Sequence, residues 1–384
     1  MTVGILKESA GENRVAFLPE HVIILKKLNL NVIVESNCGL NASAPDEGYL
    51  TAGAKTGSRD EVIRTTDLLA CINLPSEEVL GKMRPKQILL GGLNPVLNQQ
   101  AIEIIAKNGV SGFSLDFIPR TTRGQAMDIL SSMATIAGYK AVLDAALRLP
   151  RFFPMFMSAA GTVKPAKLLI LGAGVAGLQA IAVARKLGAV VEVFDVRSAV
   201  KEEVKSLGGK FIEVEGAKEE VSAGGYAVEQ TEEFKQKQRQ LIHDHAKISD
   251  VVLCTAQIPG KKAPLLLTKA TVEEMRPGSI VIDLAASTGG NCEITENGKA
   301  IQHNLVTIIG KSDYPSDMPF DASKMFGNNL INFLKIIVNK EGNFELNFSD
   351  ELVKGTCITK DGQIINERYK SLTPTLSERE GEGK

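Results

Sequence analysis

Three glycines near the middle of the chain have the spacing of a dinucleotide-binding turn. The stretch KLLILGAGVAG places Gly172, Gly174 and Gly177 between an apolar run and a helical pattern at Val175–Leu187. The first glycine permits a tight turn, the second lets a pyrophosphate approach the backbone, and the third lets the helix pack closely on the strand. The free N–H groups at the helix N-terminus then face the phosphates. The contacts predicted here are Gly172, Gly174, Val175, Ala176 and Gly177.

An acidic residue at the end of the following strand indicates which dinucleotide binds. The run VVEVF leads into Asp195, which lies 18 residues beyond Gly177. A carboxylate at this place accepts hydrogen bonds from the adenosine ribose and repels a 2′-phosphate, so we predict NAD(H) contacts from Asp195, Val196 and Arg197. Two alternatives stay open: Arg197 could receive a 2′-phosphate, and the glycines could form a structural turn that binds no cofactor.

Much other chemistry lacks its residues. The sequence has no GxSxG, HExxH or Walker motif, which argues against serine hydrolases, metal hydrolases and ATPases. His243 and His245 form an HxH pair in a polar stretch, but no third ligand is evident, so we interpret them as part of a solvated helix and predict no metal. The other two histidines are His21 and His303.

Hydride transfer remains. Oxidation of an alcohol or amine also moves a proton and needs a general acid or base near the nicotinamide. Transfer between two nicotinamides needs neither, because only the hydride moves. It does need a second nucleotide site, and this sequence has one glycine fingerprint. A partner that binds the second nucleotide is therefore predicted.

The bulk composition fits a globular protein of about two domains. The 384 residues are 44% hydrophobic and 23% charged, and the net charge of −1 argues against nucleic-acid binding. Five scattered cysteines without a CxxC pair are typical of a reducing compartment, so we expect a cytoplasmic protein.

Short apolar runs alternate with helical patterns, which predicts an α/β protein with two Rossmann-like, doubly wound parallel sheets. The first series of expected strands is Val3–Ile5, Val32–Val34, Leu68–Ile72, Ile88–Leu90 and Gly112–Leu115. The second is Leu168–Leu171, Val190–Phe194, Lys210–Glu213, Val251–Cys254, Ile280–Leu284 and Leu305–Ile309. Expected helices are His21–Leu28, Asn98–Lys107, Met133–Leu147 after a Ser131–Ser132 cap, and Ser323–Asn339.

We interpret the second series as a domain inserted into the first. The N-terminal domain is expected at 1–130 plus 319–370, and the NAD-binding domain at 131–318. The last residues, 371–384, have two large apolar side chains and are expected to form a flexible tail. Loops after the strands are where a Rossmann sheet binds its ligand, so Gln257 in TAQIPGKKAP is a further predicted contact, with an ordinary loop as the alternative.

Several stretches resemble one known superfamily. The opening VGILKES…ENRVAFLPE (3–20), MRPGSIVIDLA (275–285) and GGN (289–291) resemble the alanine dehydrogenase and transhydrogenase superfamily. The stretch PRTTRGQAMDILSSMATIAGY (119–139) resembles the transhydrogenase branch, as do TAQIPGKKAP and YPSDMPFDASKMFGNN (314–329). The resemblance extends from residue 1 to about residue 340.

This resemblance implies roles for the RGQAMD loop. Asp128 and Ser131 would hold the nicotinamide carboxamide, while Arg120 and Gln125 would orient the ring without donating a proton. Tyr139 lies about two helical turns further on. The alternative is a capped loop in which Asp128 and Ser131 satisfy N–H groups of the following helix. By the same resemblance, the remaining cofactor contacts are Met127 and, in a mobile loop at AGGY, Gly225 and Tyr226.

Three departures separate the chain from alanine dehydrogenases. The segment 68–75, LLACINLP, has no substrate lysine, and the segment 87–95 has no catalytic histidine. Ala286, Ser287 and Thr288 stand where an acid is expected. An alanine-type dehydrogenase and an NAD-binding module without catalysis therefore remain as alternatives to the transhydrogenase function.

The resemblance also implies an assembly. The chain looks like the separate first subunit of a split, proton-translocating transhydrogenase. Its expected partners are an NADP(H)-binding subunit and a membrane proton-channel subunit. The chain itself is expected to be a homodimer that attaches to the inner face of the cell membrane through these partners.

Overall fold

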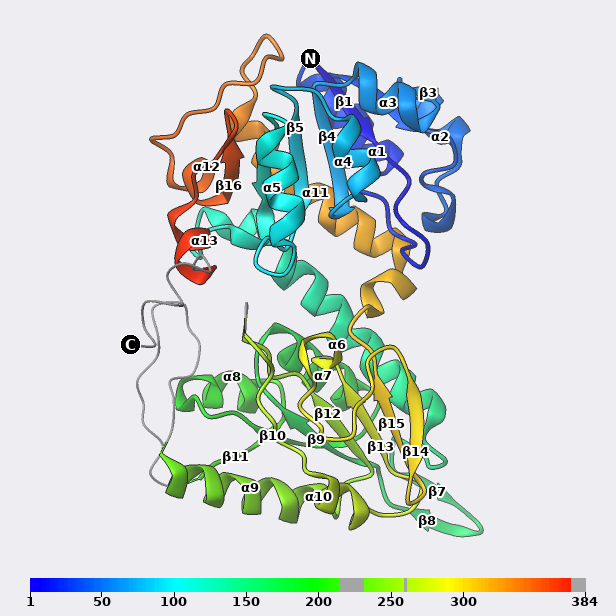
Figure 1. Ribbon diagram of the computed structural model, residues 1–384. Coiled ribbons are helices and arrows are strands. Elements are labelled where there is room, and N and C mark those ends of the chain that lie inside the picture. The colour runs from blue at the N-terminus through cyan, green and yellow to red at the C-terminus, as the bar shows by residue number, and fades with distance from the viewer. Residues whose placement is uncertain (215–230, 259–260, 374–384) are drawn as a thin grey trace, which may run out of the picture. The chain divides into compact units, whose positions relative to one another are not determined.

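The computed structural model describes residues 1–214, 231–258 and 261–373, and it divides into two compact units (Figure 1). The first unit comprises Met1–Met133 and the chain from Ser316 onward, and the second comprises Ala134–Pro315. Each unit contains one large, mostly parallel sheet with helices. The predicted class, α/β with two Rossmann-like domains, is confirmed.

The first unit contains an eight-stranded sheet in the order β17-β16-β6-β5-β4-β1-β2-β3. The six strands from β6 to β3 are parallel, and β16 and β17 add an antiparallel edge. Their bounds are β1 Thr2–Ile5, β2 Asn31–Glu35, β3 Lys55–Gly57, β4 Leu68–Asn73, β5 Ile88–Gly92, β6 Ser111–Ser114, β16 Cys357–Lys360 and β17 Gln363–Ile364.

Helices cover both faces of this sheet. Along β4, Leu68 and Ala70 face one buried apolar cluster while Leu69 and Cys71 face another, as alternation along a strand requires. The helices of this unit are α1 Pro19–Lys27, α2 Asp46–Thr51, α3 Arg59–Thr65, α4 Glu77–Lys82, α5 Gln99–Lys107, α11 Pro319–Ile337, α12 Glu351–Thr356 and α13 Glu367–Leu372. The 3-10 turns are η1 Leu40–Ala42, η2 Leu115–Phe117 and η3 Gly124–Met127.

The second unit contains a seven-stranded sheet in the order β11-β10-β9-β12-β13-β15-β14. Only the edge strand β14 is antiparallel. The bounds are β9 Lys167–Leu171, β10 Val190–Phe194, β11 Lys210–Ile212, β12 Val251–Cys254, β13 Ile280–Asp283, β14 Ala300–His303 and β15 Val306–Gly310. A separate hairpin joins β7 Phe156–Ser158 and β8 Gly161–Val163.

Both faces of the second sheet are also buried. Leu168 and Ile170 of β9 face one cluster, and Leu169 and Leu171 face the other. The helices are α7 Val175–Lys186, α8 Lys201–Ser206, α9 Glu232–Ala246 and α10 Lys269–Glu273, with η4 Ser198–Val200, η5 Ala286–Thr288 and η6 Tyr314–Asp317. Helix α6, Ile129–Arg148, contains the boundary between the units. No helix within the described ranges is long and apolar enough to cross a membrane.

Three expectations about element ends need correction. Helix α6 begins at Ile129 rather than Met133, because the Asp128 carboxylate, not the Ser131–Ser132 pair, caps it and accepts a bond from Ser131 N at 2.9 Å. Helix α11 begins at Pro319, a residue suited to the first helical turn. The expected tail overlaps α13, which ends at Leu372; residues 374–384 lie outside the described residues.

Candidate functional site

The glycine-rich turn has the shape that its spacing predicts. Gly172 has a φ of +109°, and a Cβ there would lie 2.7 Å from Thr255 Oγ1. A Cβ on Gly177 would lie 2.0 Å from the carbonyl oxygen of Gly172, so only glycine lets α7 begin this close to β9. Gly174 is the N-cap of α7, and a Cβ there would meet nothing within 4 Å. The turn therefore leaves open space at the N-terminus of α7, where a pyrophosphate would fit.

Asp195 connects this turn to the end of β10. Its side chain is nearly buried, and Oδ2 accepts a hydrogen bond from Ala173 N at 2.8 Å. The Arg197 guanidinium binds the same carboxylate with two bonds, Nε to Oδ1 at 2.9 Å and Nη2 to Oδ2 at 2.8 Å. The acid and the arginine that sequence reasoning set against each other are therefore one ion pair beside the glycine turn.

Two residues without a predicted role hold the loops next to this turn. Asp283 is fully buried at the end of β13 and accepts bonds from Asn291 N at 2.8 Å and the Thr295 hydroxyl at 2.8 Å. The equally buried Asn291 side chain accepts from Ala256 N at 3.1 Å and donates to the Ala256 carbonyl at 2.9 Å. The GGN and IVIDLA stretches were signals for this network, but only its tertiary hydrogen bonds show what it does.

This network fixes the loop that contains Gln257. The exposed Gln257 side chain donates to the carbonyl of Leu284 at 3.0 Å, across the ends of β12 and β13. The Asn291 side chain donates to Pro264 as well, at 2.8 Å, which closes the loop on both sides. Gln257 therefore lies at the carboxyl end of the sheet, and its contact with a cofactor stays a prediction. Gly225 and Tyr226 lie outside the described residues.

In the first unit, the RGQAMD loop forms the short 3-10 turn η3. Arg120 and Gln125 have exposed side chains, whereas Met127 is only 7% exposed and packs in the core. A Cβ on Gly124 would lie 2.2 Å from the carbonyl oxygen of Pro119, so the bend in this loop requires glycine.

Asp128 and Ser131 bind each other at the start of α6. Ser131 N donates to Asp128 Oδ1 at 2.9 Å, and the Ser131 hydroxyl donates to Oδ2 at 2.6 Å. This is the capped-loop arrangement, and it leaves both side chains partly exposed. Further along α6, a Cβ on Gly138 would lie 2.1 Å from the Ala176 carbonyl oxygen, so this helix packs tightly on the start of α7. Tyr139 follows it, partly buried against the same core.

A second polar cluster lies at the ends of β1 and β4. The Arg14 guanidinium is held by Glu12, with Nε and Nη2 at 2.7 and 2.6 Å from its two oxygens. Asn73 donates to the same Glu12 carboxylate at 2.9 Å. Although burial opposes ionisation, the hydrogen bond and charge of Arg14 lower the pKa of Glu12 to about 2. The fork of Arg14 is thus occupied by a residue of its own chain.

Glu8 lies next to this pair and behaves differently. Its carboxyl accepts bonds from Ile72 N at 2.6 Å and Asn73 N at 3.3 Å. Burial raises the pKa of Glu8 to about 7, against the effect of these two amides, and the nearby Glu12 charge acts in the same direction as burial. Glu8 therefore titrates near neutral pH.

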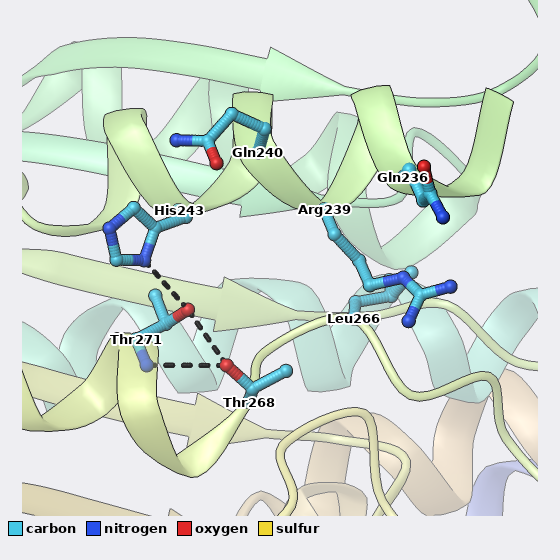
Figure 2. A pocket seen from close by; sticks show the side chains of 7 residues that line it. All are labelled: Gln236, Arg239, Gln240, His243, Leu266, Thr268 and Thr271. Atoms are coloured by element: carbon cyan, nitrogen blue, oxygen red, sulfur yellow. Dashed lines mark hydrogen bonds between the residues drawn. The ribbon is translucent and has the colours of Figure 1, made fainter. Parts of the chain in front are cut away.

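The four histidines are all engaged away from the glycine turn. His245 contacts Glu192 at 2.6 Å, His303 contacts Glu273 at 3.0 Å, and His21 accepts from Leu18 N at 2.9 Å inside the first unit. His243 lines a pocket of about 270 Å³ between α9 and α10, shown in Figure 2, where it lies 3.1 Å from Thr271 Oγ1. None of the predicted NAD(H) contacts lines this pocket. The described residues contain no group of three or more potential metal ligands.

Two Rossmann-like units, one with a glycine fingerprint and an acid at the next strand end, define a nicotinamide-nucleotide-binding α/β protein. The chain belongs to the alanine dehydrogenase/PNT family: residues 4–137 match its N-terminal domain and residues 141–367 its C-terminal domain. The resemblance seen in the sequence is thereby confirmed.

Within this family, the chain is similar to alpha subunits of bacterial transhydrogenases. In Rhodospirillum rubrum this subunit is divided into separate chains, and the first of them, an NAD(P) transhydrogenase subunit alpha chain, is 43% identical over 95% of this chain and 98% of that one. The NAD(P) transhydrogenase subunit alpha of Haemophilus influenzae is 41% identical, over 95% of this chain and 72% of that one.

Solved structures agree. The transhydrogenase from Sinorhizobium meliloti matches with a TM-score of 0.87 and 42% identity, over 95% of this chain and 100% of that one. An L-alanine dehydrogenase matches with a TM-score of 0.80 over 97% and 99%, but at 21% identity it shows the fold alone. The chain is therefore an oxidoreductase component of the transhydrogenase type.

Proposed function

We propose that this chain binds NADH on its second unit and that hydride passes from it to NADP⁺ held by a partner subunit. A membrane subunit would couple the transfer to proton translocation. The observation that carries the proposal is the glycine turn joined to Asp195 by the 2.8 Å bond from Ala173 N, which combines a phosphate cradle with a ribose acceptor. The bound nicotinamide supplies the hydride chemistry.

Positioning is the work proposed for the chain's own residues. Asp128 and Ser131 would hold the carboxamide and Arg120 and Gln125 would orient the ring, while Gly225, Tyr226 and Gln257 would close over the nucleotide. The engagement of all four histidines elsewhere supports this division, because transfer between two nicotinamides needs no proton donor. We also propose 1–130 with 319–370, and 131–318, as the two domains.

The names of the relatives, which are alpha subunits, support partner subunits for this chain. We propose an NADP(H)-binding subunit and a membrane proton-channel subunit as these partners, with the chain peripheral on the cytoplasmic face. A membrane attachment of this kind needs no spanning helix in the chain itself.

A second copy of the chain is also proposed, and the β7–β8 hairpin supports it. All six strand residues of the hairpin are exposed, and it projects from the second unit (Figure 1). Phe152 and Phe156 stack with ring centroids 4.9 Å apart, and Met157 is 70% exposed. An isolated two-stranded hairpin is only marginally stable, and apolar patches of this kind mark interfaces. A self-complementary homodimer would cover it.

Reconstitution tests the proposal. The purified chain is combined with NADP(H)-binding and membrane subunits in vesicles, and transhydrogenation from NADH to an NADP⁺ analogue is followed by absorbance. Transfer that requires all components and acidifies one side of the vesicles is expected. NADH binding without any transfer in the complete mixture would instead favour an NAD-binding module without catalysis.

A further inference from the structure

The carbonyl group that follows Gln125 is held by two asparagines from a distant part of the chain. The side-chain amides of Asn329 and Asn332 both donate to the carbonyl oxygen of Ala126, at 2.9 and 3.1 Å. The two residues are three positions apart on α11, so their side chains lie on one face of that helix. A carbonyl oxygen has two lone pairs, and here both are occupied.

The same loop is anchored at two further points. The Arg123 guanidinium binds Asp350 at 2.7 Å, and Asp350 also caps α12 by accepting from Leu352 N at 2.9 Å. Close packing fixes the other end, since a Cβ on Gly355 would lie 2.6 Å from Pro119 Cγ. Residues that follow position 318 therefore hold the loop on both sides of Gln125, whose own side chain is exposed.

Asn329 is not explained by core stability. It is buried on a helix whose neighbouring core residues, Leu330 and Phe333, are apolar. Its Oδ1 has no hydrogen-bond partner within the described part of the chain. A buried acceptor without a partner destabilises a fold, and an apolar residue of similar size would avoid that cost. The gain from this amide therefore lies in its bond to the loop.

We propose that Asn329 and Asn332 are positioning residues for Gln125, which act by fixing the Ala126 carbonyl so that the exposed glutamine is presented in one orientation. This inference rests on the proposed function for its effect on hydride transfer. The loop anchoring itself does not depend on that function. The class of residue involved is thus a paired amide clamp on the backbone, outside the residues that would touch the nicotinamide.

Substitution of Asn332 tests the clamp, because this residue is partly exposed and its loss leaves the core intact. Asn332→Ala removes the donor, and Asn332→Asp keeps the shape but turns an acceptor toward the Ala126 carbonyl. Asn343→Ala, an exposed asparagine beyond α11, is the matched control. We expect NADH affinity of the isolated protein to stay within about twofold for all three, while kcat for transfer in the complex falls about tenfold for the Asn332 variants only.

A double-mutant cycle separates positioning from general damage. If Asn332 acts through Gln125, Asn332→Ala should have no further effect on kcat in a Gln125→Ala background. An equal fall of kcat in both backgrounds would overturn the proposal. An unchanged kcat for Asn332→Ala in the otherwise unmodified chain would overturn it too.

Amide hydrogen exchange provides a readout that is independent of catalysis. Exchange of a peptide covering residues 121–128 should be faster in Asn332→Ala than in the unmodified chain or in Asn343→Ala. Unchanged exchange would disprove the clamp whether or not the chain transfers hydride. An inactive complex with faster exchange would reject the proposed function and retain the anchoring.

Discussion

Among single residues, Asp195 and Arg197 determine nucleotide choice together. The carboxylate is available to ribose hydroxyls, but the guanidinium bound to it at 2.8 Å offsets part of its repulsion of a 2′-phosphate. We expect NADH to bind much more tightly than NADPH, and Asp195→Asn to narrow the gap, because the amide keeps a bond to the turn but loses the charge. Fluorescence titration with both nucleotides measures this. Arg197→Ala should widen the gap, and equal affinities in the unmodified protein would contradict the prediction.

Gln125 should matter only when both nucleotides are present. It lies exposed on η3, beyond the bend at Gly124, and makes no contribution to the glycine turn of the second unit. Gln125→Asn should therefore leave NADH binding and the melting temperature nearly unchanged. Transfer in the reconstituted complex should fall by about 100-fold, since an error of about 1 Å in position can have this effect. Unfolding, loss of NADH binding or transfer at the full rate would each reject the role.

Glu8 should give the protein a pH-dependent stability. Its pKa in the folded state is about 7, above the ordinary value of 4.5, so the folded protein holds a proton that the unfolded chain releases between these pH values. Its contribution is therefore fully present below pH 4.5 and is lost as pH rises through 7. Glu8→Gln should flatten the fall in melting temperature between pH 5 and pH 8, roughly the range set by these pKa values.

The exposed Glu77→Gln variant is the matched control for Glu8, and calorimetry at several pH values measures both. Glu12 acts in the opposite direction, because its pKa of about 2 means that its stabilisation is lost as pH falls from 4.5 toward 2. Equal pH dependence of the Glu8→Gln and unmodified proteins would contradict the assignment.

How far residues can be predicted depends on the range of their contacts. The glycine turn and Asp195 are local in sequence, and their geometry follows from spacing alone. The amides on Ala126 come from more than 200 positions away, and the Asp283–Asn291 network depends on loops that only the folded sheet brings together. No periodicity or motif in one sequence encodes such pairings.

Among the secondary-structure elements, the strongly apolar strands were predictable and the short or polar ones were not. Val190–Phe194 and Val251–Cys254 have the expected bounds, since each is a continuous apolar run. Strand β3, with the sequence KTG, and the antiparallel β14 and β16 have no such pattern. Strand β16 is fixed by distant contacts, such as the Thr359 hydroxyl that accepts from Gly112 N at 2.9 Å.

The β7–β8 hairpin is the element on which the dimer depends. Met157→Asp places a charge in the exposed apolar patch, so it should convert the dimer to a monomer in sedimentation velocity while NADH binding persists. Leu305→Asp is the matched control, because Leu305 is similarly exposed in a turn with φ +61°, where aspartate is tolerated. A dimer that survives Met157→Asp would locate the interface elsewhere.

For the molecule as a whole, the alternation of strands and helices was enough for the α/β class, and the return of the chain at α11 was visible from its apolar face. The antiparallel edges of both sheets were missed, because strand direction at an edge is set by long-range pairing. Sequence reasoning therefore predicted the two-unit architecture better than the borders of its sheets.

The purified whole chain should form no NADH from alanine and NAD⁺. An amino-acid dehydrogenase needs a cation for the substrate carboxylate and a group that takes up a proton. Here Arg14 is held by Glu12 at 2.6 Å, and Asn73 stands in the segment where the family resemblance places a lysine. NADH binding measured on the same preparation shows that the protein is active for nucleotide. Asn73→Lys alone should stay inactive, because Arg14 remains paired; turnover of alanine by the unmodified chain would make it a self-sufficient dehydrogenase and overturn the transhydrogenase proposal.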